Sequence, residues 1–113
     1  MSAAKAVIRY EEFARLDLRV AQVVEARPHP NADRLLVLVV DLGRLGRRQI
    51  VAGIREHYDP QQLLGTQVVV LVNLEEALIR GEESQGMLLA AEAAGEPVLL
   101  RPEKSCPPGS VIK

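Results

Sequence analysis

The apolar runs of this chain are short and rich in valine, and this feature limits most strongly what the chain can fold into. Two of them are 35–40 (LLVLVV) and 68–72 (VVVLV). Valine favours strands because its branched side chain packs well on a pleated surface. Both runs are far below the ~20 residues that a membrane-spanning helix needs. With a length of 113 residues, the pattern predicts one β-rich domain.

Turn residues divide the chain into short strands around one short helix. We predict strands over 17–26, 34–42, 48–54, 67–73, 85–92 and 97–100. The helix is predicted in 59–65, where Asp59 suits the N-cap and Pro60 the first helical position. Gln62 completes a capping box, and Gly65 suits a left-handed C-cap. The helix therefore falls between the third and fourth strands.

Five strands with a helix between the third and fourth is the order of an OB-fold barrel. We therefore predict a mainly all-β, single-domain OB-fold five-stranded barrel over 1–113, with its core at about 13–100 and a terminal extension at each end. Segment 10–16 fits one or two helical turns, and the proline-interrupted tail 101–113 supplies at most an edge strand. The run 34–42 is apolar on both faces, so we expect a subunit partner or the extensions to cover the outside.

Charge and cysteine usage narrow the function classes. The net charge is −1, with 14 basic and 15 acidic residues, which differs from the strongly basic balance of most nucleic-acid binders. A nucleic-acid site must then be a local basic patch with salt-sensitive affinity. Cys106 has no partner cysteine, which indicates a reducing compartment or no redox role. Without a signal peptide or a membrane segment, we expect a soluble, cytoplasmic protein with no membrane partner.

The residues that chemistry requires are not grouped in this sequence. No Ser-His-acid set, metal-ligand spacing or phosphate-cradling glycine loop is evident. We therefore expect no enzyme activity, no metal and no cofactor, and we interpret His29 and His57 as turn or surface residues. Only three aromatic residues are present, too few for the stacking platforms of single-strand binders.

In an OB-fold, ligands bind beside the loops that join strands one to two and four to five. In this chain those loops are predicted at 27–33 and 73–84. Side chains that bind phosphate or base edges lie in or beside them: Arg27, His29, Asn31, Arg34, Asn73, Arg80, Ser84 and Gln85. These residues indicate a binding surface, with the alternative that Asn31 and its neighbouring prolines only shape a turn. Met87 lies between Gly86 and Leu88 in a predicted strand, where a methionine commonly packs in the core.

Four blocks occur in order: HPNADRLLVLVVDLG, RQIVAGIREHYDP, LLGTQVVVLVNL and RGEESQGMLLAA. Together they resemble the signature of the tRNA-binding domain family, over about Phe13 to Ala91. That family includes the C-terminal appendage of bacterial methionyl-tRNA synthetases, free-standing bacterial tRNA-binding proteins and the endothelial monocyte-activating polypeptide domain. The resemblance implies a homodimer of OB-folds, accessory to aminoacylation or tRNA stability, that recognises the shape of folded tRNA without reading its sequence. A synthetase is a further candidate partner, and the termini are expected in dimer contacts.

The family's functional positions, carried onto this chain, fall on Asn31, Arg34, Arg80, Ser84, Gln85 and Met87. Arginine can fork to phosphate, while amides and hydroxyls donate to phosphate or ribose oxygens. Methionine offers an adaptable apolar contact. The chain departs from the family at Glu75 and Glu76, where members usually have a basic residue and a proline; Glu82 and Glu83 also flank Arg80. These carboxylates weaken attraction to RNA unless the loop points them away.

Two other functions stay open from the sequence. A secretion-related branch of the same family is described as a peptide-binding export-type chaperone. The acidic balance suits that function, but that branch lacks the intact HPNAD and SQGM blocks found here. The third alternative is a purely structural module that dimerises or docks another protein through 1–9 and 101–113.

Overall fold

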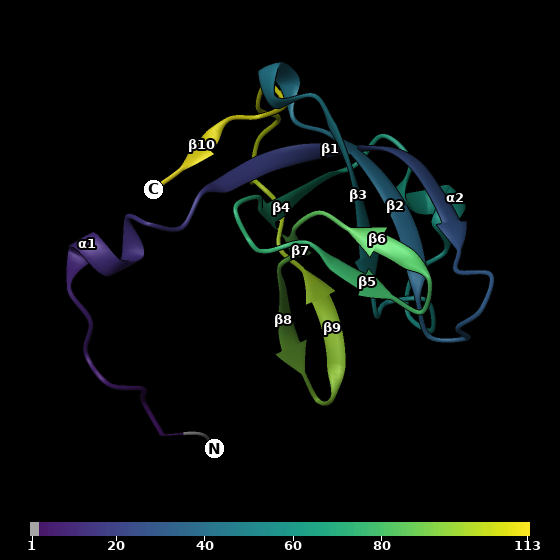
Figure 1. Cartoon of the computed structure of the whole chain (residues 1–113), viewed down its shortest axis with the longest axis horizontal. Coiled ribbons are helices and arrows are strands. Elements are labelled where there is room, and N and C mark those ends of the chain that lie inside the picture. Colours follow the sequence, from purple (N-terminus) through teal and green to yellow (C-terminus); the bar gives the residue numbers. More distant parts are fainter. Residues whose placement is uncertain (1–2) are drawn as a thin grey trace.

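The computed structural model describes residues 3–113 as a mainly β protein with two one-turn helices (Figure 1). In chain order its elements are α1 (Tyr10–Phe13), β1 (Leu18–Pro28), β2 (Leu36–Asp41), the 3-10 turn η1 (Gly43–Leu45), β3 (Arg47–Ala52), α2 (Pro60–Leu63), β4 (Gln67–Leu71), β5 (Ala77–Ile79), β6 (Glu82–Ser84), β7 (Met87–Leu88), β8 (Ala90–Ala93), β9 (Glu96–Leu99) and β10 (Val111–Ile112). The predicted helical turns at 10–16 and 59–65 are confirmed, each as a single turn.

The barrel is an antiparallel sheet in the order β3-β2-β1-β4-β7. The first half of β1 pairs with β4, from Leu18 to Gln22, and the second half pairs with β2, up to Pro28. The register shifts between Val23 and Glu25, and such a bulge bends a strand. This bend lets one strand serve both sides of the barrel. With α2 between β3 and β4, the predicted OB-type barrel is confirmed.

The core lies inside the barrel. Every second side chain of each strand points into it. Leu36, Leu38 and Val40 of β2 are fully buried there, together with Ile50 of β3 and Val70 of β4. Burial of every second residue is the pattern of a strand that has one face against the core. The core therefore forms on the concave face of a single curved sheet.

The outer face of β2 and β3 is covered by the chain's own β5–β6 hairpin. Val37 and Val51 face outward, opposite to the core cluster, and are still buried. They stand in register beside Arg27 of β1. Glu82 of the hairpin reaches across this row to bond Arg27. We expected a subunit partner or the terminal extensions to cover the outside of the strands. Over β2 and β3 the cover is instead this hairpin.

That hairpin lies in a segment predicted as a loop, so the prediction for 73–84 was wrong. Ala77–Ile79 pairs with Glu82–Ser84 around a two-residue turn. Arg80 and Gly81 both have positive φ, at 54° and 93°, as a type I′ turn requires. Arginine is an unusual first residue for that turn, in which asparagine or glycine is preferred, and the signal was missed for this reason.

The predicted single strand 85–92 is divided in the structure. β7 pairs with β4 in the barrel, whereas β8 pairs with β9 in a separate hairpin that projects from it (Figure 1). Gly86 lies just before β7 with φ 133°, and a Cβ there would stand 2.8 Å from the Leu71 carbonyl oxygen. The strand prediction was therefore wrong in extent, because the chain leaves the barrel after Leu88.

The predicted caps of α2 are mostly confirmed. Asp59 Oδ1 accepts a hydrogen bond from Gln61 N at 2.9 Å, and Gly65 has a φ of 81°. The amide of Gln62, which a capping box would bond to the Asp59 side chain, bonds instead to the Asp59 carbonyl at 3.0 Å. The helix ends after one turn, and its Leu63 is buried in the core cluster.

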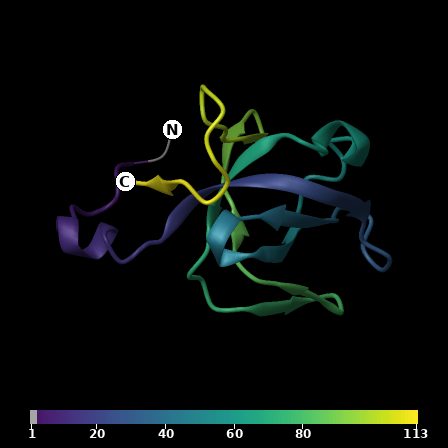
Figure 2. The same cartoon turned by 90° about the horizontal axis from the view of Figure 1, so that it is seen from above.

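Both ends of the chain extend from the same side of the barrel (Figure 2). β10 pairs with the start of β1, with Leu18 opposite Ile112, as expected of an edge strand in the tail. The segment before β1 carries α1 away from the barrel. Within 3–113 no helix has the length and apolar character that crossing a membrane demands.

Candidate nucleic-acid interface

The two loops predicted to form one surface lie side by side. An open hollow of about 330 Å³ is lined by Ala32, Asp33, Arg34 and Leu35 from the β1–β2 loop, and by Arg80 from the tip of the β5–β6 hairpin. We call these two segments, 29–35 and 77–84, the paired arms. The first arm lies at the end of the barrel where β1 stops and β2 starts, and the tip of the second arm meets it there.

The paired arms are bonded to each other. His29 Nε2 lies 3.0 Å from the carbonyl oxygen of Ile79. Arg27 of β1, just before the first arm, also bonds the second arm, with its Nη2 2.6 Å from Glu82 Oε1. His29 lies in the connection between β1 and β2, as the turn alternative predicted, but it is only 2% exposed, so the surface alternative was wrong. It is buried because the hairpin, which the sequence did not reveal, folds over it. His57 is exposed, as predicted.

The two predicted arginines present their charges to solvent. The side chain of Arg34 is 84% exposed, and its Nε lies 3.5 Å from Glu56 Oε1. An exposed pair at that distance contributes little and yields readily to another anion. Arg80 is exposed at the hairpin turn. The hollow between them therefore offers two guanidinium groups, which bind phosphate through planar, forked donors.

Ser84 and Gln85 hold the barrel closed. Ser84 is 4% exposed. Its hydroxyl accepts a hydrogen bond from Val51 N at 3.0 Å and donates one to the Gly86 carbonyl at 3.1 Å. Gln85 exchanges two bonds with Gln49, one through its backbone amide at 2.8 Å and one through Oε1 at 3.0 Å. These contacts join β3 to the segment before β7. A direct contact of Ser84 or Gln85 with RNA stays a prediction.

Asn31 and Met87 lie on the surface but in different places. Asn31 is exposed, and its backbone amide donates to His29 Nδ1 at 2.9 Å. Met87 is 44% exposed, so it is not a core residue. It lines a second, mostly apolar hollow of about 250 Å³, which also includes Val51, Leu88 and Pro97. Arg34 and Arg80 are thus brought together, and Met87 is placed beside a separate depression.

The carboxylates near Arg80 do not all face the arms. Glu82 points toward the barrel, like Ser84 two residues later, and is paired with Arg27. Glu83 pairs in register with Leu78, which is 72% exposed. Because successive strand side chains alternate in direction, Glu83 points away from the barrel. Glu75 and Glu76 are exposed ahead of β5.

Arg55 holds the first arm from the barrel side, a role that the sequence analysis missed. Its Nη1 donates to the Ala32 carbonyl at 3.0 Å and to the His29 carbonyl at 3.4 Å. Its backbone amide bonds the Arg34 carbonyl at 3.3 Å. The only signal was its position in the RQIVAGIREHYDP block, which says nothing of its partner. The arm that carries Arg34 is therefore fixed at several points.

Other chemistry finds little support in the described residues. Within 3–113, no three His, Cys, Asp or Glu side chains gather closely enough to hold a metal ion. Cys106 is a free, partly buried thiol in the tail, where its backbone bonds the side chain of Gln67. The surface that stands out chemically is the hollow between the paired arms.

The model of the putative tRNA-binding domain family matches residues 18–111. The chain belongs to this family. The match includes all of the barrel, both paired arms and the start of β10.

The relatives that match this chain in sequence are much longer proteins, and the match covers only a part of each. The chain is 50% identical over 106 residues to a methionine–tRNA ligase of Thermococcus kodakarensis, a match that covers 94% of this chain and 14% of that protein. It is 51% identical over 109 residues to the methionine–tRNA ligase of Methanothrix thermoacetophila, covering 96% and 16%. The chain therefore spans about a seventh of the length of these curated relatives.

Solved structures of similar proteins share the fold. A MetRS-related protein of Pyrococcus horikoshii has a TM-score of 0.89 at 31% identity, covering 96% of this chain and 100% of that one. The chaperone CsaA of Bacillus anthracis has a TM-score of 0.87 at 35% identity with the same coverage. The C-terminal domain of Plasmodium vivax p43 has a TM-score of 0.81 at 35% identity, covering 88% and 60%.

Proposed function

We propose that this chain binds folded tRNA through the paired arms and recognises its shape without reading base sequence. The observation that carries the proposal is the hollow in which Arg34 and Arg80 meet, on a member of the tRNA-binding domain family. Two exposed guanidinium groups at one end of a barrel suit the phosphates of a folded RNA, whose helices are contacted mostly at backbone and 2′-hydroxyl groups.

In this proposal Arg34 and Arg80 contact phosphates, and exposed Asn31 donates beside them. Met87 makes an apolar contact from the separate hollow that it lines. Ser84 and Gln85 act by closing the barrel, and Gln85, which is partly exposed, also contacts the RNA. The role is accessory to aminoacylation or tRNA stability in the cytoplasm, without a catalytic step. A synthetase is the candidate partner, since relatives are methionine–tRNA ligases.

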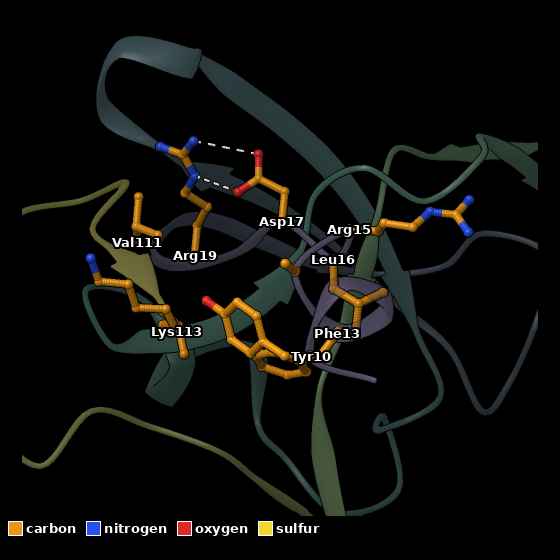
Figure 3. A pocket seen from close by; sticks show the side chains of 10 residues that line it. Tyr10, Phe13, Arg15, Leu16, Asp17, Arg19, Val111 and Lys113 are labelled. Atoms are coloured by element: carbon orange, nitrogen blue, oxygen red, sulfur yellow. Dashed lines mark hydrogen bonds and ion pairs between the residues drawn. The ribbon is translucent and has the colours of Figure 1, made fainter. Parts of the chain in front are cut away.

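We further propose that the chain acts as a homodimer through its terminal extensions. Val7 is 97% exposed and Tyr10 is 72% exposed on the N-terminal segment. Figure 3 shows Tyr10, Leu16 and Val111 around a pocket of about 340 Å³ between α1 and β10. Exposed apolar side chains on both terminal segments, beside the charged Arg15, Asp17, Arg19 and Lys113 that also line this pocket, indicate an interaction surface. Sedimentation as a monomer at micromolar concentration would contradict the dimer.

Binding of bulk tRNA across a range of salt concentrations tests the function. We expect Arg34→Ala and Arg80→Ala each to weaken all tRNAs alike and to lower the salt slope by about one. The matched control is Arg44→Ala in η1, an exposed arginine at the opposite end of β2. Absence of binding at low salt, or binding without a salt slope, excludes the proposal.

The second candidate is a peptide-binding chaperone, favoured by the similarity to the chaperone CsaA of Bacillus anthracis. That function predicts suppression of client aggregation by a protein that fails to bind tRNA. A purely structural docking module predicts neither activity. The same tRNA titration, run beside an aggregation assay, separates all of them.

A further inference from the structure

We propose that His29 is the positioning residue that joins the two arms, so that Arg34 and Arg80 act on one RNA as a unit. The inference rests on the proposed function, because it explains how that surface is assembled. The bond from His29 links positions 50 residues apart in the chain. Within the described residues, His29 and Ser84 are the buried polar side chains, and Ser84 is accounted for by barrel closure.

The contacts of His29 fix its tautomer. A carbonyl oxygen only accepts, so Nε2 must carry the hydrogen in the 3.0 Å bond to Ile79. Nδ1 then has a free lone pair, which accepts from the backbone amide of Asn31 at 2.9 Å. One neutral tautomer therefore satisfies both contacts. A doubly protonated ring would lose the Asn31 bond, since both nitrogens would then be donors.

The two bonds have different effects. The Nδ1 bond is local and shapes the turn ahead of Arg34. The Nε2 bond crosses to the other arm and holds the carbonyl of Ile79, the residue directly before Arg80. The second bond is therefore the one that sets the position of Arg80 against Arg34.

The hairpin needs such a bond because it is short. β5 and β6 have three residues each, and an isolated two-stranded hairpin is marginally stable in water. Its other links to the barrel act on β6: Arg27 bonds Glu82, and Gln49 bonds the carbonyl of Glu83 at 2.9 Å. His29 acts on β5. The first arm is separately fixed by Arg55, so a loss at His29 releases mainly the hairpin tip.

Two substitutions separate the two bonds. Asparagine places its amide where Nδ1 lies, and glutamine places its amide where Nε2 lies. His29→Asn therefore keeps the acceptor for Asn31 and loses the link to Ile79, whereas His29→Gln keeps that link. We expect His29→Gln to stay within about threefold of wild type in tRNA affinity, and His29→Asn to lose about tenfold, or about 1.4 kcal/mol.

A double-mutant cycle distinguishes positioning from loss of stability. In wild type we expect Arg80→Ala to weaken tRNA binding about tenfold, as much as His29→Asn, and in the His29→Asn background less than about twofold, because Arg80 no longer meets the RNA held by Arg34. General destabilisation would leave that ratio unchanged. An equal effect of Arg80→Ala in both backgrounds, or equal losses in His29→Asn and His29→Gln, overturns the inference.

Amide hydrogen exchange without RNA completes the test. Faster exchange in 77–84 for His29→Asn, but not for His29→Gln, supports the link directly. If wild type binds tRNA and the exchange of these amides is unchanged in His29→Asn, the inference fails and the proposed function stands. If wild type binds no tRNA, the proposed function fails and this inference fails with it.

Discussion

Arg27 of β1 and Glu82 of the β5–β6 hairpin form an ion pair of 2.6 Å. The same carboxylate oxygen lies 3.5 Å from Gln49 Nε2. The Arg27 side chain is 50% exposed and that of Glu82 is 23% exposed, so solvent screens the pair and its contribution to stability is small. Its larger effect is on the charge of the surface. Glu82 neutralises Arg27, which lies near the same end of the barrel as Arg34 and Arg80.

Glu82→Gln tests this effect. The amide keeps the size of the side chain and removes the charge that pairs with Arg27. We expect tRNA affinity to rise by about two- to fivefold at low salt and the salt slope to steepen by up to about one. The matched control is Glu83→Gln, which changes net charge equally on the opposite face of the hairpin. An equal rise in both variants would mean that net charge alone matters.

Arg80 occupies a strained backbone position, which predicts a conflict between stability and binding. Its φ is 54°, and Ala94, the equivalent residue of the β8–β9 turn, has a φ of 52°. A left-handed conformation costs an ordinary residue about 1 kcal/mol, and asparagine tolerates it better. Arg80→Asn and Ala94→Asn should each raise the free energy of unfolding by about 0.5–1 kcal/mol in urea denaturation.

Only one of these two variants should change tRNA binding. Arg80→Asn removes a guanidinium from the hollow, whereas Ala94 lies in the other hairpin. We expect weaker binding for Arg80→Asn and wild-type binding for Ala94→Asn in the same titration. Unchanged binding by Arg80→Asn would remove this arginine from the proposed surface.

Gly86 is required where the chain passes close to β4. A Cβ at this residue would lie 2.8 Å from the Leu71 carbonyl oxygen, and its φ is 133°. Gly86→Ala should lower the free energy of unfolding by about 3 kcal/mol or more, through strain combined with a backbone clash. Gly95→Ala, with φ 82° and open space around it, is the control and should lose about 1–2 kcal/mol. Equal losses would mean that the clash is relieved at no cost.

The Ser84 hydroxyl is predicted to stabilise the barrel. Ser84→Ala leaves the buried amide of Val51 without its acceptor, which should cost about 1–3 kcal/mol in chemical denaturation. Ser105→Ala, at an exposed position of the tail, should change stability very little. At temperatures where Ser84→Ala stays folded, an unchanged salt slope for tRNA would separate barrel closure from phosphate contact.

Local patterns were sufficient for β1 to β4 and for α2. Alternation of apolar residues, an Asp-Pro start and a glycine end act within a few residues, so they are visible in the chain itself. The same patterns failed over 73–92. There the hairpin turn uses Arg80 at a positive φ, and Gly86 ends one pairing where another begins. Both features depend on neighbours elsewhere in the fold.

The sequence by itself determined the chain order of β1 to β4 with α2 between β3 and β4, and the loop beside Arg34, because strand alternation and turn chemistry are short-range effects. Only the tertiary structure decided that His29 is buried between the arms, that Glu82 is neutralised by Arg27, and that Ser84 closes the barrel. Each of these depends on a single backbone or side-chain atom brought within hydrogen-bonding distance from a remote part of the chain. Such a contact leaves no periodic pattern in the sequence.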